Sequence, residues 1–447
     1  MTKSIFRFRQ DLRIDDNIWL YKLSKQDTEI LPIFILDENL IDWFWTLSDP
    51  RFWFLKDALK NLDKNLKKIW LNLTIIKWTP EIIIPKIIKK LQINNIYLNK
   101  SYDKYWMQRD FTIKNFCKEN SISFYDFIYN LLQDPLDIKP YKVFSPYFKT
   151  RISKLPKNFE LKKPNNCKNI NSNKIQKLKN NIDIIDIKDL DNIITAKNKY
   201  WPVNQRKKIF ENFDFSNYEH SKNFPAINWS SRLSPYIRFG IISIRHLYNI
   251  AQNQNANNYL FELGRREFRH QIAIYFPYSR EKEFLEKRQK LNRQNNKQLF
   301  QKFCDAQTGY PIVDAAIRQL KETNRMHNRL RMIVASFLTK DLLIDRRRWE
   351  EFFKKHLLDY EEVVNIWNRQ WSASVWADPK PIRIFSPIRQ SERFDSETKF
   401  IKKRIPELKN FSPKEIHDPL NNDLKYSKPI VNHKEQTIKA KEMYYWK

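Results

Sequence analysis

The fold of the C-terminal half is decided by residues 308–345, which read TGYPIVDAAIRQLKETNRMHNRLRMIVASFLTKDLLID. Apolar residues recur there at steps of three and four in Ile312–Leu320 and again in Asn328–Leu343. The same spacing returns in Trp349–Leu358. Because this period places apolar side chains on one face of a helix, we predict a mainly helical region from Asn204 to the end of the chain.

The first 130 residues instead alternate between short β-rich runs and amphipathic helical patterns. The clearest helices are Arg51–Lys68 and Glu81–Leu91, and the predicted strands are Ser4–Phe8, Ile30–Leu36, Leu73–Trp78, Asn95–Asn99 and Ile122–Phe127. This alternation is typical of a doubly wound parallel sheet. Nucleotide-like ligands often bind at the carboxyl ends of such strands, but no glycine-rich phosphate loop follows the first one, so the sheet alone predicts no particular ligand.

A Lys- and Asn-rich stretch from about 155 to 198 separates the two patterns. This composition is typical of a solvated spacer, and we prefer that interpretation to a DNA-binding arm. The expected fold is an α/β N-terminal domain with a doubly wound parallel sheet over residues 1–130, and an all-α C-terminal domain over residues 201–447. Residues 131–200 are expected to link the two domains.

The charge of this chain of 447 residues is strongly positive, with a formal net value of +31 and an isoelectric point near 9.8. Such a charge favours an anionic partner, with nucleic acid as the obvious candidate. A compositional bias toward Lys, Asn and Ile explains the charge equally well. Charge alone therefore decides little about function.

Cysteines and apolar runs exclude several classes of protein. Cys117, Cys167 and Cys304 lie far apart without the spacing of metal ligands, and we expect no metal site. The longest apolar run, Ile30–Leu36, is too short to cross a membrane, and the first residues form no apolar signal segment. We therefore expect a soluble cytoplasmic protein without a membrane partner.

Three segments resemble the photolyase/cryptochrome family of flavoproteins. They are Phe6–Asn17 (FRFRQDLRIDDN), Ser230–Gly240 (SSRLSPYIRFG) and the long stretch 308–345 quoted above. The resemblance is strongest to class I cyclobutane pyrimidine dimer photolyases. It implies an antenna domain at residues 1–130, an FAD- and DNA-binding domain at residues 201–447, and an enzyme, a deoxyribodipyrimidine photo-lyase, which breaks carbon–carbon bonds.

The resemblance also implies how this chemistry is done. A dimer splits once it accepts one electron, so reduced FAD must lie in a dry pocket beside a dimer that is flipped out of damaged DNA. The implied FAD-binding residues are Tyr218, Ser230, Ser231, Arg232, Leu233, Ser234, Arg266, Arg331, Asp359, Tyr360, Glu361 and Asn365. Taken without the resemblance, the three serines are better explained as a helix N-cap and turn.

Two of these positions have particular consequences. Asn365 stands where the family faces flavin N5, and a neutral amide there bonds to several redox states without forcing one charge. Glu361 stands where the family usually has Asp, so the charge is kept on a longer side chain.

A second implied set contacts DNA. The implied residues are Lys222, Glu262, Arg265, Asn328, Arg329, Met332, Trp371 and Gln390, with Lys222 and Gln390 on the strand and the others at the lesion. Glu262 is expected to hydrogen-bond the pyrimidine edge and stabilise the radical anion, which makes it catalytic together with Asn365. Considered singly, each is explained as well by core packing or a surface charge. Enzymes for the (6-4) lesion place histidines near residue 328, where this chain has only His327.

The chain departs from the family in a regular way. Relatives usually carry Trp at Arg7, Arg265, Arg293, Arg325, Arg346, Arg348, Arg369 and Arg404, and usually carry Gly at Trp78, Trp229, Trp349, Trp367 and Trp376. Arg293, Arg346 and Arg369 stand at the catalytic electron-transfer positions. Arginine cannot relay an electron, and burial of an unpaired guanidinium costs several kcal/mol.

We hypothesise that the codons at these positions are translated differently in the organism. The codon written here as Trp at the family's Gly positions would be read as Gly, and the codon written as Arg at the family's Trp positions would be read as Trp. This hypothesis accounts for the presence of only three glycines, where a usual frequency of roughly 7% gives about thirty. If the affected positions use the same codons as undisputed Arg and Trp residues, the hypothesis fails. The alternative is degeneration to a protein that does not repair DNA.

Two other functions stay open. A cryptochrome is a blue-light photosensor without repair activity, and a third possibility is a nucleic-acid-binding protein that has lost its flavin. A second antenna chromophore, either a folate or a deazaflavin, is expected, but the sequence does not decide between them. Some relatives bind it in the region of Asn99, Tyr102, Arg109 and Asp110, and we do not assign these residues to it. No obligate protein partner is predicted.

Overall fold

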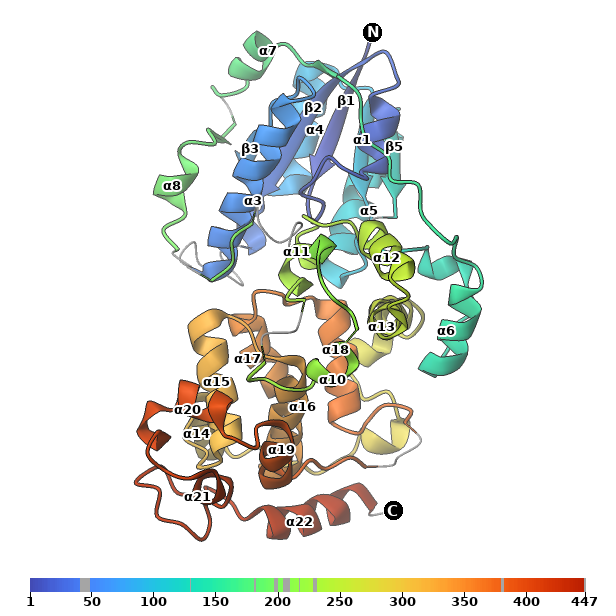
Figure 1. Ribbon diagram of the computed structural model, residues 1–447. Helices are drawn as coiled ribbons and strands as arrows, with labels where there is room; N and C mark the ends of the chain where they lie inside the picture. The colour runs from blue at the N-terminus through green and yellow to red at the C-terminus, as the bar shows by residue number, and fades with distance from the viewer. Residues whose placement is uncertain are drawn as a thin grey trace. The chain divides into compact units, whose positions relative to one another are not determined.

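The structure is a computed structural model that describes residues 1–40, 49–128, 130–180, 182–196, 200–203, 210–216, 218–227, 231–378 and 382–445 (Figure 1). Its contacts divide the chain into two compact units. The first unit comprises Met1–Ile138, Arg151–Phe213 and Arg232–Leu263, and the second comprises Lys139–Thr150, Asp214–Ser231 and Gly264–Lys447. Among the described residues, no helix is both long and apolar enough to cross a membrane.

The first unit is built on a sheet whose described strands follow the order β5-β4-β1-β2-β3-β7, with β6 beside β2. The strands are β1 (Thr2–Phe8), β2 (Thr28–Leu36), β3 (Thr74–Lys77), β4 (Asn95–Asn99), β5 (Ser123–Phe127), β6 (Lys168–Asn169) and β7 (Ile184–Ile185). Every pair is parallel except β3 with β7. The five predicted strands and the parallel sheet are confirmed.

Helices cover this sheet because its strands are apolar along most of their length. Ile83 and Ile87 of α4 pack in one core with Ile33 of β2 and with Ile113 of α5. The helices of this unit include α1 (Ile18–Leu23), α3 (Pro50–Lys67), α4 (Pro80–Leu91), α5 (Lys104–Glu119), η1 (Pro135–Asp137), α7 (Ser172–Gln176), α8 (Leu190–Ile193), α11 (Ser234–Arg238) and α12 (Ile244–Asn253). The predicted helices at residues 51–68 and 81–91 are therefore present.

The stretch 155–198 does more than connect two domains. Within it β6 pairs with β2 and β7 pairs with β3, and Ile170, Leu178 and Ile182 join the core beneath α4. The solvated-spacer interpretation is wrong for these segments. The Lys and Asn residues that dominate the composition surround a few apolar positions, and only pairing with the sheet reveals their role. The proposed boundaries at residues 130 and 200 stay a prediction.

The second unit is helical, and no strand occurs among its described residues. Two helices run through its boundary with the first unit, α6 (Phe144–Ile152) and α13 (Asn257–Tyr275). Its own helices are α10 (Tyr218–Ser221), η2 (Pro277–Arg280), η3 (Glu286–Arg288), α14 (Lys297–Cys304), α15 (Pro311–Thr323), α16 (Asn328–Ser336), η4 (Phe337–Asp341), α17 (Arg346–His356), α18 (Glu362–Ser372), α19 (Pro387–Phe394), α20 (Lys399–Arg404), η5 (Pro406–Leu408), α21 (Pro413–His417) and α22 (His433–Tyr445).

The apolar stripes recognised in the sequence form the core of this unit. Ile312 and Ile317 of α15 pack with Leu330 and Val334 of α16 and with Phe353 of α17. The helical pattern predicted for residues 328–343 is divided between α16 and the π-helical turn η4. The predicted helical C-terminal half is confirmed.

Glycine is so rare that other residues occupy left-handed backbone. Position 309 requires glycine, because its φ is +76° and a Cβ there would lie 2.3 Å from the backbone of Lys428. Fourteen described residues other than glycine also have positive φ. Among them is Trp70, which follows α3 at φ 63° with 66% of its surface exposed. A bulky residue is strained in this conformation, and a glycine commonly ends a helix there.

Candidate functional site

Two side chains of α13 converge on one buried carboxylate in the second unit. Arg266 donates from Nη2 to Oε1 of Glu361 over 2.8 Å, and His270 places Nε2 3.0 Å from the same oxygen. Arg266 and His270 are four residues apart, so both project from one face of the helix. Glu361 is the N-cap residue of α18, and these contacts tie the start of α18 to α13.

Asn365 lies one turn further along α18 and is 8% exposed. Its amide Nδ2 donates to the backbone carbonyl of Glu361 over 3.0 Å. The amide nitrogen is thereby held toward the helix start, which leaves the side-chain oxygen to act as an acceptor.

The residues just before Glu361 are anchored to two other helices. Arg331 of α16 donates from Nη2 to both carboxylate oxygens of Asp359, over 3.0 and 2.8 Å. The hydroxyl of Tyr360 donates to Glu350 of α17 over 2.8 Å. The predicted residues 359–361 are therefore fixed to α16, α17 and α13 in turn, which gives this short segment a single conformation.

The other predicted flavin residues lie apart from this cluster along the chain. Tyr218 begins α10, and the ammonium group of Lys222 lies 5.4 Å from the centroid of its ring. Ser231 is half-buried, and Ser230 lies outside the described residues. Tyr218 and Ser231 belong to the second unit.

The end of the predicted phosphate segment belongs to the first unit. There Arg232 has a left-handed backbone at φ 53°, Leu233 is buried, and Ser234 is the exposed first residue of α11. Leu233 is the N-cap residue of this helix, so neither Ser231 nor Ser234 occupies the N-cap position.

Three predicted lesion residues lie together on α16. Asn328 is its exposed first residue, and Arg329 places Nη1 3.9 Å from the sulfur of Met332. Arg329 also donates from Nη2 to Oδ1 of Asn223 over 2.6 Å. The structure thus holds Arg329 against both Met332 and the segment that contains Lys222.

The remaining predicted DNA contacts are distributed over other helices. Trp371 of α18 stacks on Trp367 with ring centroids 6.4 Å apart. Gln390 of α19 has a buried Oε1 that accepts no hydrogen bond from the described residues. On α13, Glu262 is half-buried, whereas Arg265 is exposed with its guanidinium 5.6 Å from the ring of Phe144.

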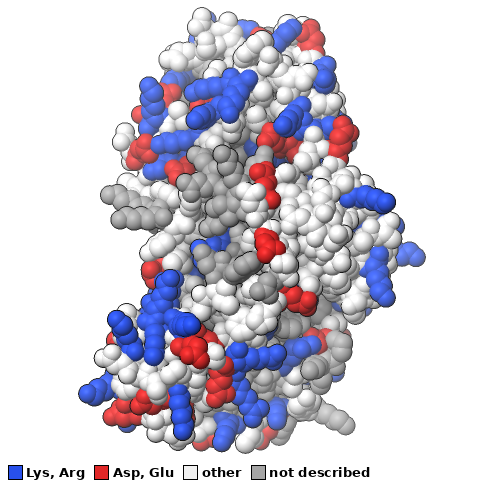
Figure 2. Space-filling view, in the orientation of Figure 1, with Lys and Arg blue, Asp and Glu red and all other residues white. Residues whose placement is uncertain are grey.

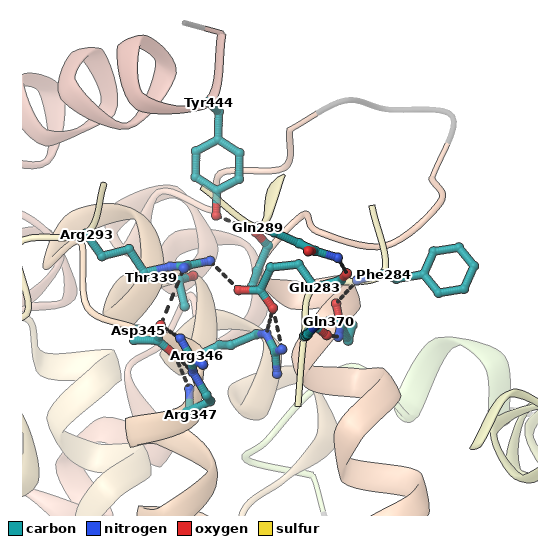
Figure 3. A network of polar contacts seen from close by, with 12 residues as sticks. Glu283, Phe284, Gln289, Arg293, Thr339, Asp345, Arg346, Arg347, Gln370 and Tyr444 are labelled. Carbon is teal, nitrogen blue, oxygen red and sulfur yellow. Dashed lines mark hydrogen bonds and ion pairs between the residues drawn. The ribbon is translucent and has the colours of Figure 1, made fainter. Parts of the chain in front are cut away.

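Two of the three arginines at the electron-transfer positions, Arg293 and Arg346, share Glu283 in a buried ionic network (Figure 3). Arg346, which has no exposed surface, donates from Nε to Glu283 over 2.6 Å, and Arg293 donates to the other oxygen of Glu283 over 2.6 Å. Arg369 pairs with Glu350. Each of these three guanidinium groups therefore has a carboxylate partner.

Burial in this network still disfavours charge. It lowers the pKa of Arg346 and lowers that of Arg369 well below its usual range, and nearby Arg346 lowers the pKa of Arg369 further. Burial alone would raise the pKa of Asp345, but the hydrogen bonds from Arg347 and the charge of Arg293 bring it below its usual range. The cluster is therefore held by opposite charges that repay a large desolvation cost.

Among the described residues, no carboxylate forms an ion pair with the buried guanidinium group of Arg7. Its side chain lies inside β1 with 1% exposure, and its Nε and Nη1 make no hydrogen bond within the described part of the chain. Burial lowers its pKa well below its usual range, and Arg109 and Arg9 lower it further, against the weaker effect of Asp110 and Asp37. A neutral side chain fits this position better than a guanidinium.

Sequence reasoning missed two residues that organise these sites. His270 could have been found, because it follows Arg266 by one helical turn on the same face. Glu283, which pairs with Arg293 and Arg346, lies between η2 and η3 and follows no periodic pattern. Its role depends on which distant arginines the fold brings to it.

Surface charge adds little to this picture. Figure 2 shows Lys and Arg side chains over much of one face, with Asp and Glu side chains between them. On that face the charge does not form a single basic stripe. The positions of individual cations are therefore more informative than the net charge.

Comparisons with known proteins agree with the geometry. Residues 4–165 match the family model of DNA photolyase, and residues 259–445 match the FAD binding domain of DNA photolyase. A deoxyribodipyrimidine photo-lyase from Synechococcus sp. is 32% identical, covering 98% of this chain and 96% of the relative.

Solved structures share the fold. An archaeal photolyase from Sulfolobus tokodaii, described with two FAD molecules, superposes with a TM-score of 0.88 at 29% identity, covering 99% of each chain. A cryptochrome from Synechocystis sp. superposes with a TM-score of 0.87 at 22% identity over 99% of each chain, which shows the fold alone.

The chain belongs to the DNA photolyase family. Its α/β and helical architecture is that of the family, and the predicted enzyme class, a deoxyribodipyrimidine photo-lyase, is confirmed by relatives of nearly full length.

Proposed function

We propose that this protein splits cyclobutane pyrimidine dimers in damaged DNA under blue light, with reduced FAD as the electron donor. The observation that carries the proposal is the anchored cluster of Arg266, Glu361 and Asn365, inside the stretch that matches the FAD binding domain of DNA photolyase. The relative from Synechococcus sp., with its name of deoxyribodipyrimidine photo-lyase, supports the substrate class.

The chain's own residues fit an FAD molecule. Asn365 offers a buried amide oxygen as an acceptor, and Glu361 and Asp359 hold the guanidinium groups of Arg266 and Arg331 in place. The proposed FAD-binding set is Tyr218, Ser230, Ser231, Arg232, Leu233, Ser234, Arg266, Arg331, Asp359, Tyr360, Glu361 and Asn365. The chemistry that bound FAD supplies is the transfer of one electron to the dimer under light.

Residues of α13, α16, α18 and α19 then hold the substrate. Glu262 is proposed to hydrogen-bond the pyrimidine edge, and Met332 and Trp371 to form apolar walls for the flipped bases. Arg265, Asn328 and Arg329 complete the lesion contacts, while Lys222 and Gln390 bind the strand. The buried Oε1 of Gln390, which has no partner among the described residues, supports its assignment, because an N–H group of a DNA base could donate to it.

Arg293, Arg346 and Arg369 stand where electrons reach the flavin from the surface, and a guanidinium cannot carry them. We propose that the organism's own protein has Trp at these positions, in line with the decoding hypothesis. Repair is then expected with host decoding, and little or none with the literal sequence.

The domain roles follow from the same proposal. Residues 1–130 act as the antenna domain, and residues 201–447 bind FAD and DNA. A second chromophore is proposed for the antenna domain, either a folate or a deazaflavin, and the two FAD molecules of the Sulfolobus tokodaii photolyase support the presence of a second chromophore site. Damaged DNA is the only macromolecular partner proposed.

The deciding experiment irradiates dimer-containing oligonucleotides with blue light in the presence of the reduced, host-decoded protein. We expect restored pyrimidines in the light and none in the dark. Glu361→Gln should lose bound flavin, seen as loss of visible absorbance, because Arg266 loses its ion-pair partner and the start of α18 is no longer held to α13 by a charge. Glu407→Gln, at an ion pair half exposed at the surface, is the matched control and should keep its flavin.

A cryptochrome-type photosensor is the alternative function. It predicts a yellow protein that changes its absorbance in light yet leaves every dimer intact. A colourless protein that still binds DNA would refute both light-dependent functions.

A further inference from the structure

A hollow of about 590 Å³ opens between the segment 216–224 and α19 in the second unit. Residues of that segment form one wall, and Arg393 and Phe394 of α19 form the other. We call it the α10–α19 hollow. None of its lining residues belongs to the flavin or lesion sets proposed above.

Aromatic rings form one side of the α10–α19 hollow. The ring centroids of His220 and Phe224 lie 4.8 Å apart, and Phe224 meets Phe394 edge to face at 6.1 Å. Phe394 is buried, Phe224 is half-buried and His220 is exposed. Such rings give a flat base a surface on which to stack, and stacking tolerates any base.

Two guanidinium groups lie at the same place, where Glu219 also lines the hollow. Arg329 is 4.3 Å and Arg393 5.2 Å from the centroid of the Phe394 ring. Within the described ranges neither arginine forms an ion pair with a carboxylate. Burial lowers the pKa of Arg329, and the charge of Arg393 lowers it further, so the two cations repel each other.

An anion between these arginines would remove that repulsion. Guanidinium groups bind phosphate through paired N–H donors, which makes an uncompensated arginine pair suited to a phosphodiester. Arg329 is already held in place, because it donates to Asn223 over 2.6 Å. Asn223 also lines the α10–α19 hollow, so the same contact joins the charged and aromatic sides.

We propose that the α10–α19 hollow holds one nucleotide of the DNA strand that flanks the lesion, with its phosphate at Arg393 and its base against Phe224 and His220. This inference rests on the proposed function, because it takes DNA as the partner. Its place on the chain supports that choice, since Lys222 directly precedes the lining residue Asn223 and Gln390 precedes Arg393 by three residues on α19. A stacked base together with a phosphate on the same strand favours a nucleotide over a free anion or a peptide.

The test measures binding in the dark by fluorescence anisotropy, so it does not depend on repair. Dimer-containing single strands are shortened one nucleotide at a time on each side of the dimer. We expect the affinity of the unmodified protein to fall by about tenfold when the nucleotide held by the hollow is removed. We call this tenfold fall in affinity the step. Arg393→Gln should weaken binding to the full-length strand and abolish the step.

Matched variants separate this site from general electrostatics. Arg389→Gln removes an exposed arginine of the same helix and should keep the step. The slope of log affinity against log salt should fall by about 0.7 for Arg393→Gln, the value of one single-strand phosphate contact, and stay unchanged for Arg389→Gln. Phe224→Trp should keep tight binding, whereas Phe224→Leu should lose it.

Two results would overturn the inference. One is an equal loss of affinity in Arg393→Gln and Arg389→Gln, which would mean that only net charge matters. The other is equal binding of strands that carry a base or an abasic residue at the critical position. Failure of the repair assay with the step intact would remove the proposed activity and leave the nucleotide site standing.

Discussion

Replacement of Arg7 by methionine should stabilise the first unit substantially. Arg7 is 1% exposed within β1, and no hydrogen bond or ion pair of its side chain occurs among the described residues. A buried ion without a partner costs several kcal/mol, and Met fills a similar volume with an unbranched apolar chain. Since Asp37 and Asp110 partly offset the charge, we take the low end of this range, a gain of about 2 kcal/mol.

Hydrogen exchange is the assay suited to a chain with two units, because it follows local and global opening of β1 and β2 separately from the second unit. A gain of about 2 kcal/mol should slow the exchange of the amides in these strands by about 30-fold. Arg7→Trp, the residue that the decoding hypothesis assigns, should protect the strands at least as well.

Arg51 provides the matched control in the same unit. It is 6% exposed and donates to Asp49 from Nε over 2.8 Å, so Arg51→Met should destabilise by about 3 kcal/mol through the loss of a buried pair. Equal or faster exchange in Arg7→Met than in the parent would refute our account of Arg7.

Three further predictions concern single positions. Trp70→Gly should stabilise by about 1 kcal/mol in chemical denaturation, since it relieves a left-handed Trp with little packing, whereas Trp53→Gly inside α3 should destabilise. Burial raises the pKa of Asp314 to about 6. The stabilising contribution of its protonated carboxyl group is therefore full below pH 4 and is lost as pH rises through 6. Asp314→Asn should flatten the pH dependence of the unfolding midpoint, and an unchanged slope would contradict this. Gly309→Ala should lower the melting temperature through a loss of about 2 kcal/mol or more, because its Cβ would collide with the backbone of Lys428 at positive φ, and a parent-like melting curve would disprove this strain.

The sequence by itself determined the two kinds of architecture. Strands at residues 4–8, 30–36 and 95–99 and helices at 312–320 and 349–358 follow from periodicity, because a buried face imposes a spacing of two or of three to four residues. The resemblance to the photolyase/cryptochrome family implied a common FAD-binding role for Arg266, Arg331 and Asn365, and that role stays a prediction.

The sequence misjudged features that depend on partners. The stretch 155–198 looked like a spacer because its apolar residues are few, yet Ile170 and Ile182 pack beneath α4. Nothing in the local sequence points to Glu283 as the common partner of Arg293 and Arg346.

Only the tertiary structure decided which charges are compensated. Arg266 pairs with a carboxylate 95 positions away in the chain, and Arg331 pairs with one 28 positions away. The strands around Arg7 bring no hydrogen-bond partner to its Nε or Nη1 among the described residues. The amino-acid composition does not distinguish these arginines from one another. The energy of a buried charge depends on the groups within a few ångströms of it, and distant parts of the chain supply those groups.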